Sequence, residues 1–152
     1  MRYDRNEAVK YAKKWALSRN PAYYDYDYFG GDCTNFVSQC IYAGFPQMNY
    51  SENGWYYINA NSKSPSWTGV EYLYNFLISN KSDGPRGRNI EESELEIGDV
   101  IQLSFSSNLF GHSLIVSGIE GSNILICAHT IDSLDRPLNS YSYEQARFIK
   151  VY

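Results

Sequence analysis

The sequence predicts an α+β domain in which helices come first and an antiparallel sheet follows. Apolar residues recur at helical spacing in the first half of the chain, whereas the second half contains short apolar runs separated by turn residues. Helices followed by consecutive strands are typical of α+β folds and not of alternating parallel units. With 152 residues and no internal repeat, the chain is expected to form a single domain, residues 1–152.

Two helices are predicted near the N-terminus. Asp4 can cap a helix over residues 6–18, because its carboxylate can accept N–H groups of the first turn. The apolar side chains of this segment share one face: Ala8, Val9, Ala12, Trp15 and Ala16. After a tyrosine-rich connection, the Gly30-Gly31 turn leads into a second helix over residues 33–43.

The middle of the chain is predicted to contain one helix between two loops. Residues 46–65 are rich in Asn, Ser, Gly and Tyr and lack periodicity, which indicates a long surface loop beside a groove. Ser66 can cap a helix over residues 67–79. Residues 81–88 then have the composition of a polar loop.

Four strands are predicted in the second half, over residues 100–105, 112–119, 124–129 and 147–152. Gly118 and Gly121 favour a tight reversal between the second and third of these strands. A hairpin there would place the start of one strand beside the end of the other. We therefore expect His112 and His129 to be neighbours.

The composition excludes several classes of function. A net charge of −4 and a pI near 5.1 disfavour a nucleic-acid or anionic-membrane binder, which needs a basic patch. No apolar run approaches the ~20 residues of a membrane span, so no transmembrane segment is expected. The first residues lack the apolar segment of a secretory signal. A cell-wall or extracellular location would therefore require an additional segment upstream.

The cysteines and tyrosines bear on the state of the thiols and on the character of the surface. Three cysteines, without a Cys-x-x-Cys pair, are too few for a disulfide-rich scaffold or a structural zinc site, so free thiols are expected. The 15 tyrosines suit a wet groove that receives a polar polymer, but they equally suit an ordinary amphipathic surface.

The most informative motif places Cys33 at the first turn of the second predicted helix, after Gly30-Gly31-Asp32. A helix N-terminus carries roughly half a positive charge and unpaired N–H groups, so it can stabilise a thiolate and a developing oxyanion. The alternative is that Cys33 is a small buried hydrophobic residue that begins a helix.

The histidines supply a candidate base. His112 can take the thiol proton and return it to a leaving amine, although such a histidine can also be an ordinary hydrogen-bonding residue. His129 or Asp132 could accept the other N–H of His112; the predicted hairpin favours His129, and Asp132 could instead cap a loop. A metal site of Cys33, His112 and His129 is a further alternative, but no closely spaced ligand pair supports it.

At these positions the sequence resembles the bacterial Putative amidase domain family. The matching segments are residues 32–39 (DCTNFVSQ), Gly98-Asp99, Gly111-His112-Ser113 and Ala128-His129-Thr130. The N-terminal residues 3–16 fit as well, so the resemblance spans nearly the whole chain. More distantly, the order of these residues is similar to the NlpC-type cell-wall peptidases and the CHAP amidases. This resemblance implies a papain-like cysteine hydrolase fold with N-terminal helices packed on an antiparallel β-sheet.

The resemblance also implies roles for individual residues. Cys33 would be the nucleophile, with its N–H in the oxyanion hole, His112 the base and His129 the residue that orients it. The NlpC-type enzymes imply that Asp32 and Thr34 bind a substrate amine. The sequence differs from those enzymes in having Thr34-Asn35 in place of Ser-Gly, and the Cys-Thr pair is closer to the CHAP amidases.

The activity implied is that of a cysteine amidase or endopeptidase. It would cleave a peptidoglycan stem peptide, or the link of that peptide to the glycan, through a Cys thioester and without metal or organic cofactor. Two alternatives remain open. One is a catalytically silent cell-wall or spore-surface binding module, and the other is an acyltransferase that uses an amine in place of water.

Overall fold

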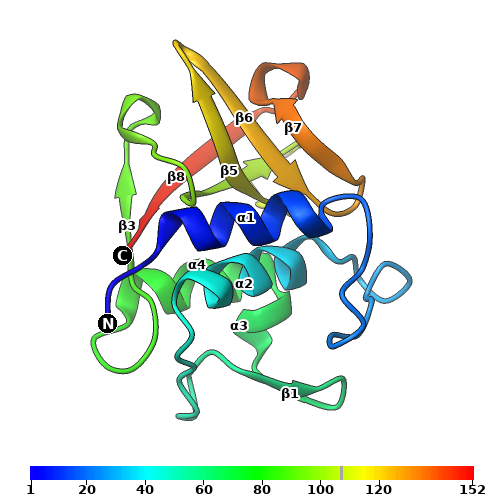
Figure 1. Ribbon diagram of the computed structural model, residues 1–152, viewed down its shortest axis with the longest axis vertical. Helices are drawn as coiled ribbons and strands as arrows, with labels where there is room; N and C mark the ends of the chain where they lie inside the picture. Colours follow the sequence, from blue (N-terminus) through cyan, green and yellow to red (C-terminus); the bar gives the residue numbers. More distant parts are fainter. Residues whose placement is uncertain (107) are drawn as a thin grey trace.

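The computed structural model describes residues 1–106 and 108–152 and places the helices against a six-stranded antiparallel sheet (Figure 1). The helices are α1 (Arg5–Trp15), α2 (Cys33–Gly44), α3 (Pro65–Thr68) and α4 (Val70–Ser79), with 3₁₀ turns at Glu92–Glu94 and Leu138–Ser140. The α+β prediction, with N-terminal helices packed on an antiparallel sheet, is confirmed.

The sheet has the strand order β3-β8-β4-β5-β6-β7. Its strands are β3 (Gly87–Ile90), β4 (Val100–Ser104), β5 (His112–Glu120), β6 (Asn123–Ala128), β7 (Ser133–Pro137) and β8 (Gln145–Val151). The separate hairpin of β1 (Tyr57–Asn59) and β2 (Ser62–Lys63) lies at the end of the molecule away from this sheet (Figure 1).

The two N-terminal helices form where the sequence predicts them. Asp4 caps α1 by accepting a hydrogen bond from the N–H of Glu7, but the helix ends at Trp15, before the predicted residue 18. Nearly all of α2 is buried, because it packs between α1 and strand β5. Its buried polar side chains have internal partners; for example, the Ser38 hydroxyl donates to the Trp67 carbonyl.

Four features of the structure differ from the prediction. The helix predicted over residues 67–79 is divided into α3 and α4, because Gly69 has an extended backbone with φ −107° and ψ 130°. The predicted loop 46–65 contains the β1–β2 hairpin, and β3 begins within the predicted loop 81–88. Strand β7 was not predicted, because its sequence Ser-Leu-Asp-Arg-Pro lacks the alternation that identifies strands.

Apolar side chains are buried on both faces of the sheet. One cluster lies between the sheet and the helices and contains Phe36, Ile41, Trp55 and Trp67. The other cluster includes Leu103, Leu114 and Ile126 and is covered by residues from the loops, among them Leu95 and Leu138. Because β5 contributes to both clusters, its position relative to α2 is well determined by packing.

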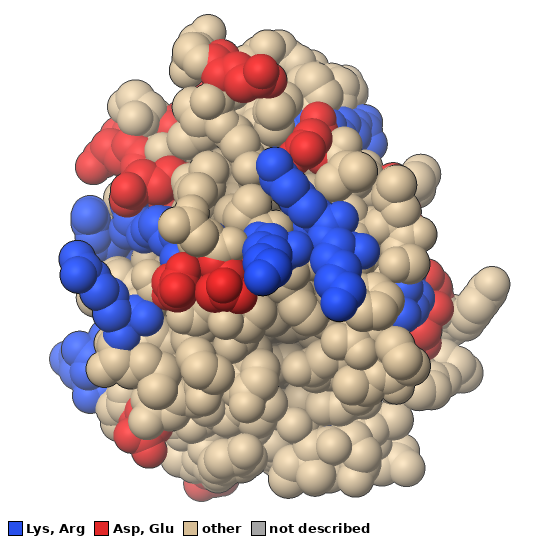
Figure 2. Space-filling model, in the orientation of Figure 1, with Lys and Arg blue, Asp and Glu red and all other residues tan. Residues whose placement is uncertain are grey.

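Charged side chains are unevenly distributed over α1. Acidic Glu7 lies in its first turn, and Lys13 and Lys14 lie in its last turn, an order that complements the helix dipole. In the view of Figure 2, basic side chains gather near the middle of the molecule, and acidic side chains lie beside them. Within the described part of the chain, none of the helices has the length and apolar character needed to cross a membrane.

Candidate active site

Cys33 is the first residue of α2, as the sequence predicts. The preceding Gly30 and Gly31 have φ values of 90° and 96°, a left-handed backbone that favours glycine. This turn brings the chain sharply into the helix, so that Cys33 sits at the helix N-terminus. Its side chain is 8% exposed.

His112 is the first residue of β5, and both it and Cys33 line one cavity of about 600 Å³. Other residues around this cavity include Phe105, Thr130, Arg136 and Tyr141. Since His112 is 6% exposed, the cavity is the route by which solvent or a ligand can reach the pair. The structure thus brings together the two residues predicted to act as nucleophile and base.

A hydrogen bond between the next two residues links the helix to the strand. The hydroxyls of Thr34 and Ser113 are 2.9 Å apart, and each belongs to the residue that follows Cys33 or His112. The Gln102 side-chain amide also donates to the Ser113 hydroxyl. Buried side chains therefore hold the N-terminus of α2 against the start of β5.

The surroundings of Cys33 keep its thiol protonated at neutral pH. Burial raises the pKa of the thiol, whereas hydrogen bonds from Ser113 and Thr34 lower it, and the Asp32 carboxylate raises it again. Burial of Cys33 therefore opposes the thiolate that the helix N-terminus favours. Desolvation of the charged sulfur outweighs the favourable helix dipole.

His112 is poised as a neutral imidazole. Burial, assisted by the positive charge of Arg136, lowers the pKa of His112 to about 4. The rings of Phe105 and Tyr141 lie near it, with centroids 6.2 and 6.0 Å from the imidazole. Among residues 1–106 and 108–152, no side chain or carbonyl forms a hydrogen bond with its ring nitrogens. Both nitrogens are therefore available to a thiol or a ligand.

His129 does not occupy the predicted position beside His112. Its Nδ1 contacts the Asp32 carboxylate at 2.5 Å, and its Nε2 contacts the Trp15 carbonyl at 2.7 Å. The strand register pairs Ile115 with Cys127, so the alternation of side chains places His112 and His129 toward opposite faces of the sheet. The orienting role predicted for His129 therefore does not fit this geometry, because both ring nitrogens are engaged elsewhere.

Asp132, the other candidate for orienting His112, is also engaged elsewhere. Both of its carboxylate oxygens accept hydrogen bonds from the Arg19 guanidinium, at 2.9 and 3.0 Å. Arg19 further binds the carboxylate of Asp27 and lies 3.7 Å from that of Asp32. Arg19, Asp27, Asp32, His129 and Asp132, together called the Arg19 network below, join the end of α1 to the turn before Cys33.

The predicted substrate-binding roles of Asp32 and Thr34 require correction. The Asp32 side chain is 1% exposed and accepts hydrogen bonds from the Tyr26 N–H and the Asn35 amide. Thr34 is fully buried against Ser113. Neither side chain lines the cavity, so their interactions are internal and maintain the shape of the Cys33 turn.

Sequence reasoning missed Arg136 and Tyr141 as cavity residues. Arg136 lies on β7, the strand without a recognisable pattern, and Tyr141 follows it after a short 3₁₀ turn. Neither residue belongs to a motif. Their proximity to Cys33 arises because β7 returns along β6, and no local signal in the sequence indicates that pairing.

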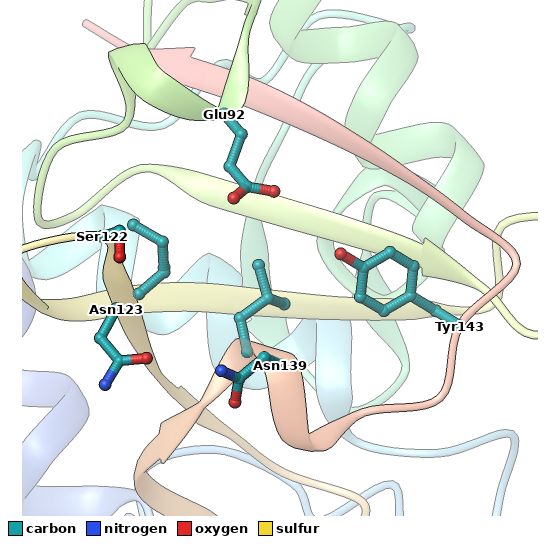
Figure 3. A pocket seen from close by; sticks show the side chains of 7 residues that line it. Glu92, Ser122, Asn123, Asn139 and Tyr143 are labelled. Carbon is teal, nitrogen blue, oxygen red and sulfur yellow. The ribbon is translucent and has the colours of Figure 1, made fainter.

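A second, smaller cavity of about 60 Å³ lacks these chemical groups. Figure 3 shows that the side chains of Glu92 and Tyr143 point into it beside Asn123 and Asn139. No cysteine or histidine lines it, so it offers no nucleophile or imidazole base. Across the described residues, no group of three or more His, Cys, Asp and Glu side chains is arranged to hold a metal ion.

Comparison with known proteins identifies relatives over nearly the whole chain. Residues 2–152 match the family described as Putative amidase domain. The uncharacterized protein YhbB of Bacillus subtilis is 39% identical over 150 residues, covering 95% of this chain and 46% of YhbB. YjcM of the same organism is 28% identical over 145 residues, covering 89% of this chain and 32% of YjcM. This chain therefore spans less than half of each relative. No solved structure matches significantly.

Proposed function

Because this chain belongs to the Putative amidase domain family, we propose that it is a cysteine hydrolase that cleaves an amide bond. The observation that carries the proposal is the meeting of Cys33 and His112 in one cavity. A nucleophile at a helix N-terminus beside an imidazole is the arrangement that thiol-dependent acyl transfer needs.

The first half of the proposed reaction forms a thioester. His112, neutral because its pKa is about 4, accepts the thiol proton as the Cys33 sulfur attacks the amide carbon. The backbone N–H of Cys33, at the start of α2, stabilises the oxyanion that develops on the carbonyl oxygen. His112 then gives the proton to the leaving nitrogen, the C–N bond breaks, and the amine departs.

The second half releases the acyl group. A water molecule gives one proton to His112 while its oxygen attacks the thioester carbon. The C–S bond breaks, the proton returns from His112 to the sulfur, and the product is a carboxylic acid. The enzyme is restored with a neutral thiol and a neutral imidazole, which is the resting state favoured by the burial of both groups.

We also propose that the domain has a papain-like fold and that its substrate comes from peptidoglycan. Support comes from the resemblance of the Cys33, Gly98-Asp99 and His112 segments to the NlpC-type peptidases and CHAP amidases. The packing of α2 on β5 is compatible with that relationship. The substrate would be a stem peptide or the amide that joins it to the glycan.

Digestion of purified peptidoglycan and of soluble muropeptides tests the activity, with the products followed by mass spectrometry. Cys33→Ala and His112→Ala should each abolish the new products. Cys40→Ala is the matched control, because Cys40 lies on the same helix but is fully buried in the core. It should retain hydrolysis once its stability is accounted for.

The same assay distinguishes the two alternatives. Sedimentation with peptidoglycan but no cleavage, equal in wild type and Cys33→Ala, would identify a binding module. Products that carry the mass of an added amine would identify an acyltransferase.

A further inference from the structure

Arg136 is half-buried, like Arg5 and Arg19, but among the described residues no carboxylate balances its charge. Arg5 pairs with Asp99, and Arg19 pairs with Asp27 and Asp132. Within the described part of the chain, Arg136 forms no such ion pair. It lines the cavity that contains Cys33 and His112, and no described residue lining that cavity is an Asp or a Glu.

The Arg136 guanidinium is nevertheless held in one orientation. Its Cζ lies 3.6 Å from the centroid of the Tyr141 ring, close enough for a cation–π contact. Its Nε donates to the Ser140 hydroxyl at 2.7 Å, and its Nη2 contacts the Ser140 carbonyl at 3.4 Å. Its Nη1 has no hydrogen-bond partner among residues 1–106 and 108–152. The side chain is therefore preorganised and keeps donors for a ligand.

Arg136 is also close to the proposed reacting groups. The Tyr141 ring on which it stacks lies 6.0 Å from the His112 ring, and the positive charge of Arg136 acts on His112. A guanidinium binds a carboxylate in a planar, charge-assisted arrangement. An anionic group held there would share the cavity with an amide placed at the Cys33 sulfur.

We propose that Arg136 is a specificity-determining residue that binds a carboxylate of the substrate. The substrate class is then an acidic peptide or acylated amino acid, with its carboxylate near the scissile amide. This inference rests on the proposed function for the identity of the scissile bond, but the recognition of an anion by the cavity can be tested without turnover.

Alkylation by iodoacetate and iodoacetamide provides that test, because the two reagents have nearly the same shape and differ in charge. Rate constants for modification of Cys33 are measured by peptide mapping, and free cysteine gives the reference ratio of the two reagents. The ratio does not depend on how much of Cys33 is ionised, since both reagents react with the same thiolate. An unpaired arginine at the cavity should favour iodoacetate by about tenfold or more relative to the reference.

Three variants identify the group responsible. Arg136→Gln should return the ratio to that of free cysteine, and Arg136→Lys should restore part of the preference because it restores the charge. Arg88→Gln is the matched control, because Arg88 is exposed on β3, at the opposite edge of the sheet from β7. This substitution removes the same charge far from the cavity, so it should leave the ratio of the iodoacetate and iodoacetamide rate constants unchanged.

The proposal is overturned if wild type shows no preference for iodoacetate, if the preference survives in Arg136→Gln, or if Arg88→Gln removes it equally. A Cys33 that reacts with neither reagent would overturn it too, because the cavity would then be closed to ligands. A different result separates the two proposals. If the protein does not hydrolyse peptidoglycan but its preference for iodoacetate depends on Arg136, the proposed function is refuted and the anion site is retained.

Hydrolysis then locates the carboxylate. Muropeptides with free carboxylates are compared with the same peptides converted to primary amides, using wild type and Arg136→Gln. We expect the acid to be preferred by wild type through a lower KM, and this preference to disappear in the variant. Equal KM values for acid and amide in wild type would contradict a substrate role for Arg136.

Discussion

At the scale of single residues, Cys33 and His112 line one cavity, and burial favours the neutral form of both. Burial raises the pKa of the thiol and lowers that of the imidazole, so both resist ionisation. The helix N-terminus then has its largest effect on charge that develops during the reaction. The site thus differs from sites in which a thiolate and an imidazolium form an ion pair before substrate binds.

The first prediction concerns pH. The proposed mechanism uses neutral His112 as the base, so kcat/KM should fall as the pH decreases through the His112 pKa of about 4. A pH–rate profile with a stable muropeptide substrate measures this acidic limb. In Arg136→Gln the limb should move toward higher pH, because a nearby positive charge that disfavours the imidazolium has been removed. A wild-type limb near the ordinary histidine value of about 6.5 would contradict the assignment.

At the scale of secondary-structure elements, the site depends on how α2 and β5 are joined. The Thr34–Ser113 hydrogen bond connects the residues that follow Cys33 and His112, the proposed nucleophile and base. The Arg19 network connects the end of α1 with the turn that precedes α2. None of these residues lines the cavity, so both connections are expected to act on the position of Cys33 and His112. The Thr34 hydroxyl also lies 3.8 Å from the Cys33 sulfur and lowers the pKa of that thiol.

Thr34→Val tests the first connection. The substitution preserves shape but removes the hydroxyl, and it should lower the free energy of unfolding by about 1–2 kcal/mol. Because the helix and strand can then shift relative to each other, kcat should decrease by roughly tenfold or more with little change in KM. Thr68→Val on α3 makes the same chemical change away from the cavity and should preserve kcat. Unchanged kcat in Thr34→Val would show that packing alone positions the pair.

His129→Gln tests the second connection. Removing the imidazole from its buried contact with the Asp32 carboxylate should lower the free energy of unfolding by about 3 kcal/mol, because the carboxylate loses one of its hydrogen-bond partners. His112→Gln should affect stability much less, because no hydrogen bond to its ring was identified among the described residues, while it should eliminate hydrolysis. Urea titrations of both variants give the comparison. The reverse order of stabilities would contradict the structural role assigned to His129.

At the scale of the whole molecule, buried charges join the two ends of the chain. The Asp99 carboxylate accepts hydrogen bonds from the Arg5 guanidinium at 2.7 Å and from the Val151 N–H at 3.0 Å. Arg5 also donates to the Val151 carbonyl. Figure 1 shows the two termini on the same side of the molecule. These contacts lead us to expect helices and sheet to unfold together as one domain.

Asp99→Ala tests that cooperativity. The variant leaves Arg5 without its buried partner and should lose about 3–5 kcal/mol of stability. Tryptophan fluorescence follows the helical layer through Trp55 and Trp67, and far-UV circular dichroism follows the whole chain. Both transitions should move together to lower urea concentration. Asp83→Ala, in an exposed loop, should leave both in place. Separation of the two transitions would indicate independent units.

Local sequence patterns predict an element correctly where its conformation depends on residues that are close in the chain. The cap at Asp4 and the apolar periodicity predict α1, and the glycine turn before Cys33 predicts the start of α2. The β5–β6 hairpin follows from its turn residues. Strand β7 could not be predicted in this way, because its residues acquire their conformation by pairing with β6.

Caps, periodicities and motifs are local, so the α+β order of elements, the family and the nomination of Cys33 and His112 could be read from the sequence. The partners of His129, the raised pKa of the Cys33 thiol and the presence of Arg136 in the cavity became apparent only in the folded structure. Each of these depends on packing between segments that are distant in the chain. Burial and hydrogen bonding across such contacts, and not residue type alone, set the charge and orientation of a side chain.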